Sequence, residues 1–283
     1  MKAKIPDIIE MLKGRDHWAR NSAAGAFEKL ANHSVFHDAM KPGIPYIIEM
    51  LKDSDPQVRD SAAGVFKNLA DHPVFHDAMK PGIPYIIKML NNSGYLARNS
   101  AAGAFMKLAN HPVFHDALKA KIPHIIEMLK GRDHWARNSA AGAFEKLANH
   151  SVFHDAMKPG IPYIIEMLKD SDPQVRDSAA GVFKNLADHL VFHDAMKPGI
   201  PHIIEMLKDS DPQVCDSAAG VFKNLADHPV FHDAMKPGIP YIIEMLNDNG
   251  HLARNSAAGA FEKLADHPVF PIPDGIRIYS GGS

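Results

Sequence analysis

Histidines followed by aspartates form the most reactive pattern in this chain of 283 residues. The chain has 18 histidines, and most belong to the motif His-x-x-x-His-Asp, as at His72, His76 and Asp77. Imidazole nitrogens and carboxylates are ligands for zinc and other divalent metals. The motif, however, spans a His-Pro break, and a histidine at a helix end can instead hydrogen-bond the last carbonyl groups. The pattern therefore favours a structural capping role, with metal binding as the weaker alternative and no metal site assigned.

The same residues give little support for catalysis. The His-Asp pairs recur six times in succession, and a single active site has no need of that regularity. The sequence lacks a Ser-His-Asp order, a phosphate-binding glycine loop and a Cys-x-x-Cys pair. We therefore expect a protein that is not an enzyme and binds no cofactor.

Composition limits the partners further. The net charge of −2 gives no electrostatic reason to bind nucleic acid or an anionic membrane. The single cysteine, Cys215, excludes an internal disulfide and indicates a reducing compartment. No apolar stretch reaches the roughly 20 residues that a membrane helix needs, and the start resembles no signal peptide. We expect a soluble, cytoplasmic protein, with a nuclear location also compatible, and no nucleic acid or membrane partner.

The chain is built from repeats of 39 residues, which we number 1 to 7. They start at residues 2, 41, 80, 119, 158, 197 and 236. Repeats 1 and 4 differ only at Asp7 and His124, and repeats 2, 5 and 6 share the turn DSDPQV. Such closely similar short units have no core of their own, so neighbours must stack to bury their apolar faces.

Each repeat predicts three helices. In repeat 2, residues 44–51 carry an apolar stripe, and residues 55–72 form a longer amphipathic pattern. Asp55 is a good N-cap and Pro56 suits the first helical position. The segment VFHDAM predicts a short third helix, and Pro-Gly a bend after it. We expect repeat 1 to lack this third helix.

The segment GIPYIIEMLKDSDPQVRDSAAGVFKNLA resembles an armadillo repeat, and DSDPQVRDSAA equally resembles the related HEAT repeat. The resemblance covers residues 2 to about 270. It implies an all-α fold, a right-handed α-solenoid of seven stacked three-helix repeats in a single domain over residues 2–270. Residues 271–283 are a non-repeat tail, whose end resembles a remnant of cloning.

One column of arginines lies at the border of the buried face, and Cys215 interrupts it in repeat 6. Its members are Arg20, Arg59, Arg98, Arg137, Arg176 and Arg254. In HEAT-like repeats the matching arginine pairs with a turn acid of the adjacent repeat. The column therefore predicts a structural ladder with a weaker junction at Cys215.

The polar side of the long helix varies between repeats while its buried side does not. This pattern indicates that the packing between helices is constant and that the exposed surface is adapted to a partner. We expect this surface to bind a partner through these residues: Trp18, Asn21, Lys29, Gln57, Asp60, Asn68, Asn99, Lys107, Trp135, Asn138, Lys146, Asp177, Asn185, Asp216, Asn224, Asn255 and Lys263.

Peptide-binding armadillo proteins hold the ligand with a tryptophan and, four residues later, an asparagine. The asparagine column maps to Asn68, Asn185 and Asn224, and the tryptophan column maps to glycine in all seven repeats. The usual pockets between successive tryptophans should therefore be absent, and Trp18 and Trp135 would replace them only in part.

These patterns predict a non-catalytic scaffold that binds a protein or extended peptide on its concave face. The main alternative is a structural solenoid that self-associates end to end and has no groove ligand. Metal binding through the His-x-x-x-His-Asp columns is a third, weaker reading.

Overall fold

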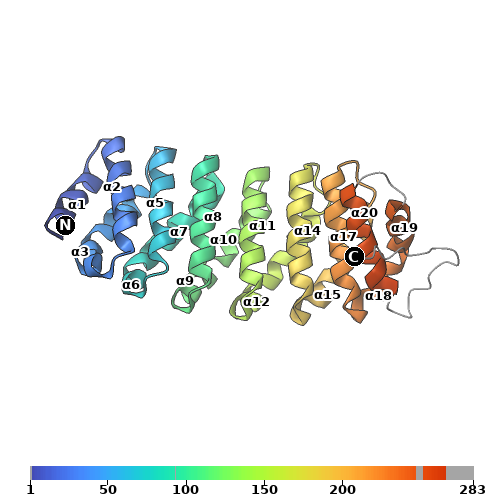
Figure 1. Cartoon of the computed structure of the whole chain (residues 1–283). Coiled ribbons are helices and arrows are strands. Elements are labelled where there is room, and N and C mark those ends of the chain that lie inside the picture. The colour runs from blue at the N-terminus through green and yellow to red at the C-terminus, as the bar shows by residue number, and fades with distance from the viewer. Residues whose placement is uncertain (1, 93, 247–250, 266–283) are drawn as a thin grey trace, which may run out of the picture. The chain divides into compact units, whose positions relative to one another are not determined.

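A computed structural model of the chain describes residues 2–92, 94–246 and 251–265 (Figure 1). It divides into two compact units, residues 1–157 and 158–283. The boundary follows Met157, the last residue of repeat 4. The single repeat domain over residues 2–270 stays a prediction, and the tail 271–283 lies outside the described residues.

The first compact unit contains helices of three lengths. They are α1 (Ile5–Lys13), α2 (His17–Ala31), α3 (His37–Met40), α4 (Ile44–Met50), α5 (Pro56–Leu69), α6 (His76–Met79), α7 (Ile83–Asn92), α8 (Tyr95–Ala109), α9 (His115–Lys119), α10 (Ile122–Leu129), α11 (His134–Ala148) and α12 (His154–Met157).

The second compact unit repeats the same order of lengths. Its helices are α13 (Ile161–Met167), α14 (Pro173–Ala187), α15 (His193–Met196), α16 (Ile200–Met206), α17 (Pro212–Ala226), α18 (His232–Met235), α19 (Ile239–Leu246) and α20 (His251–Ala265). The described residues contain no strand, so the expected all-α fold is confirmed.

The long helices begin and end where the sequence predicts. In α5 the Asp55 side chain accepts a hydrogen bond of 2.8 Å from the Gln57 amide, and Pro56 is the first helical residue. The helix stops at Leu69, just before the extended residue His72 that precedes Pro73. Capping and proline stereochemistry thus define both ends.

The third helix differs from the prediction in two ways. Instead of one helix over VFHDAM, a 3-10 turn at Pro73–Phe75 leads into α6, and a second 3-10 turn at Lys80–Gly82 follows. The Lys-Pro-Gly segment therefore forms a 3-10 turn, where the sequence predicts a bend. Repeat 1 does contain the short helix, as α3 at His37–Met40, so the expected absence is wrong.

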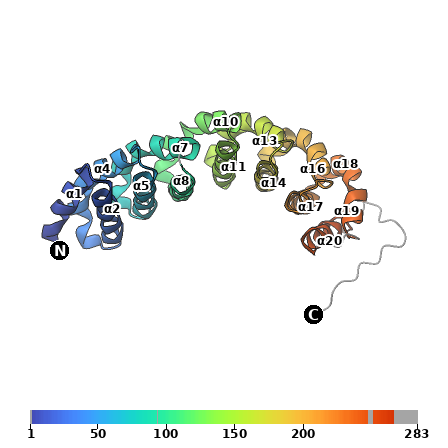
Figure 2. The ribbon, with the colours of Figure 1, turned by 90° about the horizontal axis from the view of Figure 1, so that it is seen from above.

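Within each compact unit the helices form two rows (Figure 2). The long helices α2, α5, α8 and α11 lie on one side of α1, α4, α7 and α10, and α14, α17 and α20 lie on one side of α13, α16 and α19. Each long helix buries one phenylalanine completely or nearly so, from Phe27 in α2 to Phe222 in α17. We call the side of the long helices that faces away from the shorter ones the long-helix face.

Close packing explains the glycine that precedes α4, α7, α16 and α19. A Cβ atom on Gly43 would lie 2.6 Å from the Phe27 ring, so only glycine lets α4 approach α2 this closely. None of the described helices is long and apolar enough to cross a membrane.

Candidate binding surface on the long helices

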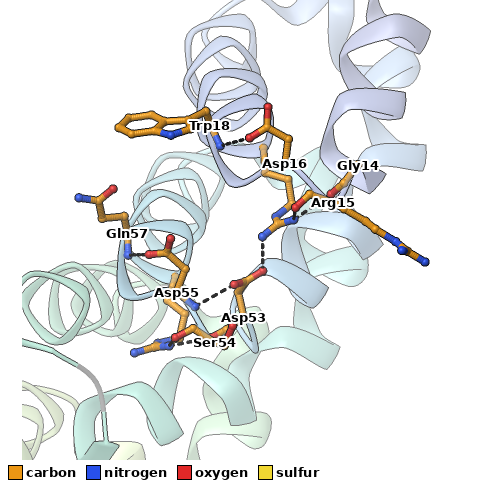
Figure 3. A network of polar contacts seen from close by, with 10 residues as sticks. Gly14, Arg15, Asp16, Trp18, Asp53, Ser54, Asp55 and Gln57 are labelled. Atoms are coloured by element: carbon orange, nitrogen blue, oxygen red, sulfur yellow. Dashed lines mark hydrogen bonds and ion pairs between the residues drawn. The ribbon is translucent and has the colours of Figure 1, made fainter.

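Two arginines of the column, Arg20 and Arg176, join neighbouring repeats as the sequence predicts. Arg20 donates from Nη1 to the carbonyl oxygens of Gly14 and Arg15, at 2.8 and 2.9 Å, and from Nη2 to Asp53 of the next repeat at 2.7 Å. Figure 3 shows this loop network around Gly14, Arg15 and Asp53. Arg176 makes the same pair with Asp209, at 2.8 Å.

Cys215 occupies the arginine position in repeat 6 and makes a smaller contact. Its Sγ donates to the Asp209 carbonyl oxygen at 2.9 Å. In α5 the matching Arg59 reaches the carbonyl oxygens of both Asp53 and Ser54, at 2.6 and 2.9 Å. A thiol is a weak donor, so this loop is held less firmly than its equivalents.

The aspartates predicted for partner binding connect successive long helices instead of standing alone. Ser100 Oγ donates to Asp60 at 2.6 Å, and Ser256 Oγ donates to Asp216 at 2.6 Å. Ser217 Oγ donates to Asp177 in the same way. These three carboxylates hold the register between neighbouring repeats.

Asparagines and lysines of the predicted set also bond to the preceding long helix. The Nδ2 atoms of Asn68 and Asn224 donate to the carbonyl oxygens of Glu28 and Lys184, at 3.2 and 2.9 Å. In peptide-binding armadillo proteins this asparagine bonds to the ligand backbone. Here the two amides are used inside the protein.

Two lysines make ion pairs across the same junctions. Lys107 lies 2.8 Å from Asp71, and Lys263 lies 2.7 Å from Asp227. The hydrogen bond from Lys107 lowers the pKa of Asp71, and a contact with His111 lowers it further. The pairs are half-exposed, so each adds little stability.

The glycine column lies open on most of the long-helix face. A Cβ atom added at Gly25, Gly64, Gly142, Gly181 or Gly220 would meet nothing within 4 Å, whereas Gly103 and Gly259 lie under the side chains of Lys67 and Lys223. Tight helix packing therefore does not require glycine at the five open positions.

A hollow of about 270 Å³ lies between α8 and α11, within the first compact unit. It brings together four predicted residues, Asn99, Trp135, Asn138 and Lys146. The others on the long-helix face lie outside it: Trp18, Lys29, Gln57 and Asn255 are exposed, and Asn21 and Asn185 are half-buried.

Residues outside the set predicted to bind a partner complete the hollow. Tyr95 packs edge-on against Trp135 with ring centroids 6.4 Å apart, and the Arg98 guanidinium lies 5.3 Å from the Trp135 ring centroid. Met106 and the open Gly142 line the rest of its wall. Tyr95 is the only tyrosine at its repeat position, where the other repeats have histidine or proline, and this was the available signal.

The recurring histidines cap helices, as the favoured reading predicts. His76 Nε2 lies 2.8 Å from the Ala70 carbonyl oxygen, and the equivalent histidines make the same bond. Because a carbonyl only accepts, Nε2 must carry the proton. Asp77 pairs with Lys80 at 2.8 Å, and no group of three metal-ligating side chains forms among the described residues.

The first histidine of four motifs, His72, His111, His150 and His228, packs against a histidine of the preceding repeat. The rings of His37 and His72 are 5.1 Å apart, and those of His115 and His150 are 5.5 Å apart. Burial lowers the pKa of His72 and of His150, and the neighbouring histidine lowers each further. Protonation of these rings is therefore opposed by the fold.

Comparisons with known proteins agree with this architecture. The family model of the HEAT repeat matches residues 44–72, and that of non-SMC mitotic condensation complex subunit 1 (Cnd1) matches residues 143–267. Each match covers less than half of the chain. No curated protein is similar enough to count as a match.

Two engineered proteins are among the solved structures with a similar fold. One engineered protein has a TM-score of 0.62 at 22% identity, over 94% of this chain and 69% of its own. A designed armadillo repeat protein in complex with the peptide (KR)4 has a TM-score of 0.51 at 14% identity, over 92% of this chain and 99% of its own. The chain is thus an α-solenoid protein of the armadillo/HEAT repeat type.

Proposed function

We propose that the chain is a non-catalytic scaffold that binds a protein or an extended peptide on its long-helix face. The observation that carries this proposal is the hollow between α8 and α11. There Tyr95 is 62% exposed and Trp135 is 40% exposed, although both are large aromatic side chains. Aromatic anchors in a recess commonly supply much of the energy of protein–protein binding.

Other features of the face support the same function. The five open glycines leave the helix backbone accessible to a partner chain. The designed armadillo protein of similar fold was solved with a peptide, which supports a peptide as one class of partner. Cnd1 is described as a complex subunit, which supports assembly with other proteins.

Selection from a random peptide library on the immobilised protein tests the proposal. The comparison variant carries Gly64→Gln and Gly142→Gln, which fill open space on the long-helix face without a clash inside the protein. The matched control carries Glu49→Gln and Glu127→Gln, on exposed positions of the shorter helices α4 and α10. Circular dichroism establishes that all proteins fold.

We expect selected peptides to bind the native protein and the control, and to be lost from the glycine variant. Peptides that bind all three proteins equally would contradict the proposal. If no peptide is selected while light scattering shows mass rising with concentration, the self-assembling alternative replaces it. Trp18→Ala and Trp135→Ala then show whether assembly depends on the same face.

A further inference from the structure

Arg98 differs from Arg20 and Arg176 because no acid stands at the matching position of the next repeat, as is also the case for Arg59, where that position is Asn92. Arg20 and Arg176 each pair with an aspartate 33 residues further along the chain, Asp53 and Asp209. The residue 33 positions after Arg98 is Gly131, which has no side chain to accept the bond. The ion pair that joins other repeats therefore cannot form here.

The Arg98 guanidinium lies over the Trp135 ring, in the wall of the hollow. Stacking on an aromatic ring suits the flat guanidinium and holds its charge in place. A fixed guanidinium presents N–H donors in a fork that matches a carboxylate. With glycine in place of the aspartate, the Arg98 guanidinium lies on the Trp135 ring and lines the hollow.

The hollow has the size and the lining for an aromatic side chain. Its apolar wall is made by Tyr95, Phe105, Met106 and Trp135, with Ala102 and Ala143 between them. A dry apolar cavity of roughly 150 Å³ is sufficient to bind benzene. The hollow, at about 270 Å³, therefore accepts a phenyl or an indole ring.

The charged side chains around the hollow determine which ligand residues are favoured next to the bound aromatic ring. The charged side chains that line it are Arg98 and Lys146, and no carboxylate is among its lining residues. Lys146 is paired with Glu145 at 2.9 Å, and the nearby Asp60 accepts its bond from Ser100. Arg98 is therefore the cation left without a carboxylate in the next repeat.

We propose that this hollow binds an acidic segment of a partner protein, placing one aromatic side chain against the wall formed by Tyr95 and Trp135 and an adjacent carboxylate on Arg98. The proposal rests on the proposed scaffold function and specifies the chemistry of its partner. The designed armadillo protein of similar fold was solved with the basic peptide (KR)4, so the expected preference here is opposite in charge.

Three fluorescein-labelled peptides test the preference by fluorescence anisotropy. The acidic probe is Gly-Ser-Glu-Asp-Phe-Glu-Asp-Ser-Gly, the basic probe has lysine and arginine in place of the four acids, and the third has alanine in place of phenylalanine. We expect the acidic probe to bind at least about tenfold more tightly than either of the others, the equivalent of one charge-assisted hydrogen bond. Salt should weaken this binding.

Gly131→Asp is the sharpest variant, because it restores the missing acid and should draw Arg98 away from Trp135. We expect the affinity for the acidic probe to fall about tenfold. Gly14→Asp is its matched control. It makes the same change in the identical loop of repeat 1, with similar space around the new Cβ atom, 3.2 Å against 3.1 Å from the nearest carbonyl oxygen. Arg20, which donates to the Gly14 carbonyl oxygen, is already paired with Asp53.

The two proposals fail in different ways. If library peptides require the long-helix face but the acidic probe binds no better than the basic one, the acidic preference is wrong and the scaffold remains. The same holds if Gly131→Asp and Gly14→Asp affect the acidic probe equally. If no library peptide distinguishes the native protein from the Gly64→Gln/Gly142→Gln variant, the scaffold proposal itself is wrong.

Discussion

Helices α2 and α11 have the same fifteen residues, HWARNSAAGAFEKLA, in different surroundings. Trp18 at the start of α2 is 66% exposed, whereas Trp135 in α11 is 40% exposed because Tyr95 and Arg98 of α8 lie against it. One sequence therefore gives an isolated tryptophan in one repeat and the wall of a hollow in the other. In a stack of repeats, the neighbouring repeat decides what a side chain does.

The arginines also show that the neighbouring repeat determines the contacts of a side chain. Arg20 is bonded to Asp53 and both side chains are largely buried, while Arg98, for which the matching residue of the next repeat is Gly131, lies on a tryptophan ring. The same residue type therefore makes an ion pair in one repeat and an aromatic contact in another.

The largest difference in the free energy of unfolding is expected between two single variants, one at Arg20 and one at Arg98. Arg20→Gln leaves the Asp53 carboxylate without its guanidinium, and we expect a loss of about 2–3 kcal/mol in the free energy of unfolding. Arg98→Gln should cost less than about 1 kcal/mol, since among the described residues its side chain makes a stacking contact with Trp135 and no ion pair with the next repeat. Urea unfolding measures both, and equal losses would contradict the difference between the two junctions.

A smaller gain is expected from Cys215→Arg. The new guanidinium should bond to the carbonyl oxygens of Asp209 and Ser210, as Arg176 does with those of Asp170 and Ser171. Two such bonds in place of one thiol contact should add about 1 kcal/mol and raise the Tm in calorimetry. Cys215→Ser is the control, and an unchanged Tm for the arginine variant would contradict the structural ladder.

The open glycines of the two identical helices should respond alike. Gly25→Ala and Gly142→Ala place a methyl group in empty space and remove a helix-weakening residue, so each should add about 0.5–1 kcal/mol. Gly43→Ala is the opposing control, because its Cβ atom would press on the Phe27 ring. Thermal unfolding measures all three, and destabilisation by either open-site variant would show that its space is not empty.

The smallest effect concerns pH. Burial and His115 lower the pKa of His150, so the folded state binds this proton less readily than the unfolded state. His150 therefore does not reduce the free energy of unfolding above about pH 6.5, and reduces it progressively as the pH falls below that value. The equivalent His33 is exposed and its ring contacts Phe36 of its own repeat.

The pH test compares the Tm of three proteins between neutral and mildly acidic solution. His150→Gln should make the Tm fall less on acidification, because the unfolded state no longer takes up a proton at this position. His33→Gln should leave the loss unchanged. If both substitutions act equally, stacking on the preceding repeat is not the cause.

The fold could be predicted because the ends of the helices in each repeat are specified by residues close to them in the sequence. Asp55, Pro56 and His72-Pro73 mark the ends of α5 with side-chain chemistry that needs no distant partner. The third helix was harder, since the choice between an α-helix and the 3-10 turn at Pro73–Phe75 depends on a few hydrogen bonds. The arginine ladder was predictable because both partners recur at a fixed separation.

The candidate site was predictable only in part, because its contacts depend on how neighbouring helices are registered. Ser100 reaches Asp60 and Lys107 reaches Asp71 across 40 and 36 positions, which a helical projection of a single repeat does not reveal. The expected lack of tryptophan pockets did not exclude a hollow built by Tyr95 and Trp135. Whether the predicted surface residues bind a partner stays a prediction.

The glycine opposite Arg98 has an evolutionary consequence. Aspartate and glycine codons can differ by a single nucleotide, and the loop position concerned is aspartate in repeats 2, 5 and 6 and glycine in repeats 1 and 4. One point mutation in a loop can therefore convert a strut between repeats into a charged contact for a ligand, while the helices keep their sequence. Duplicated repeats of this kind can acquire or discard binding positions one at a time along the array.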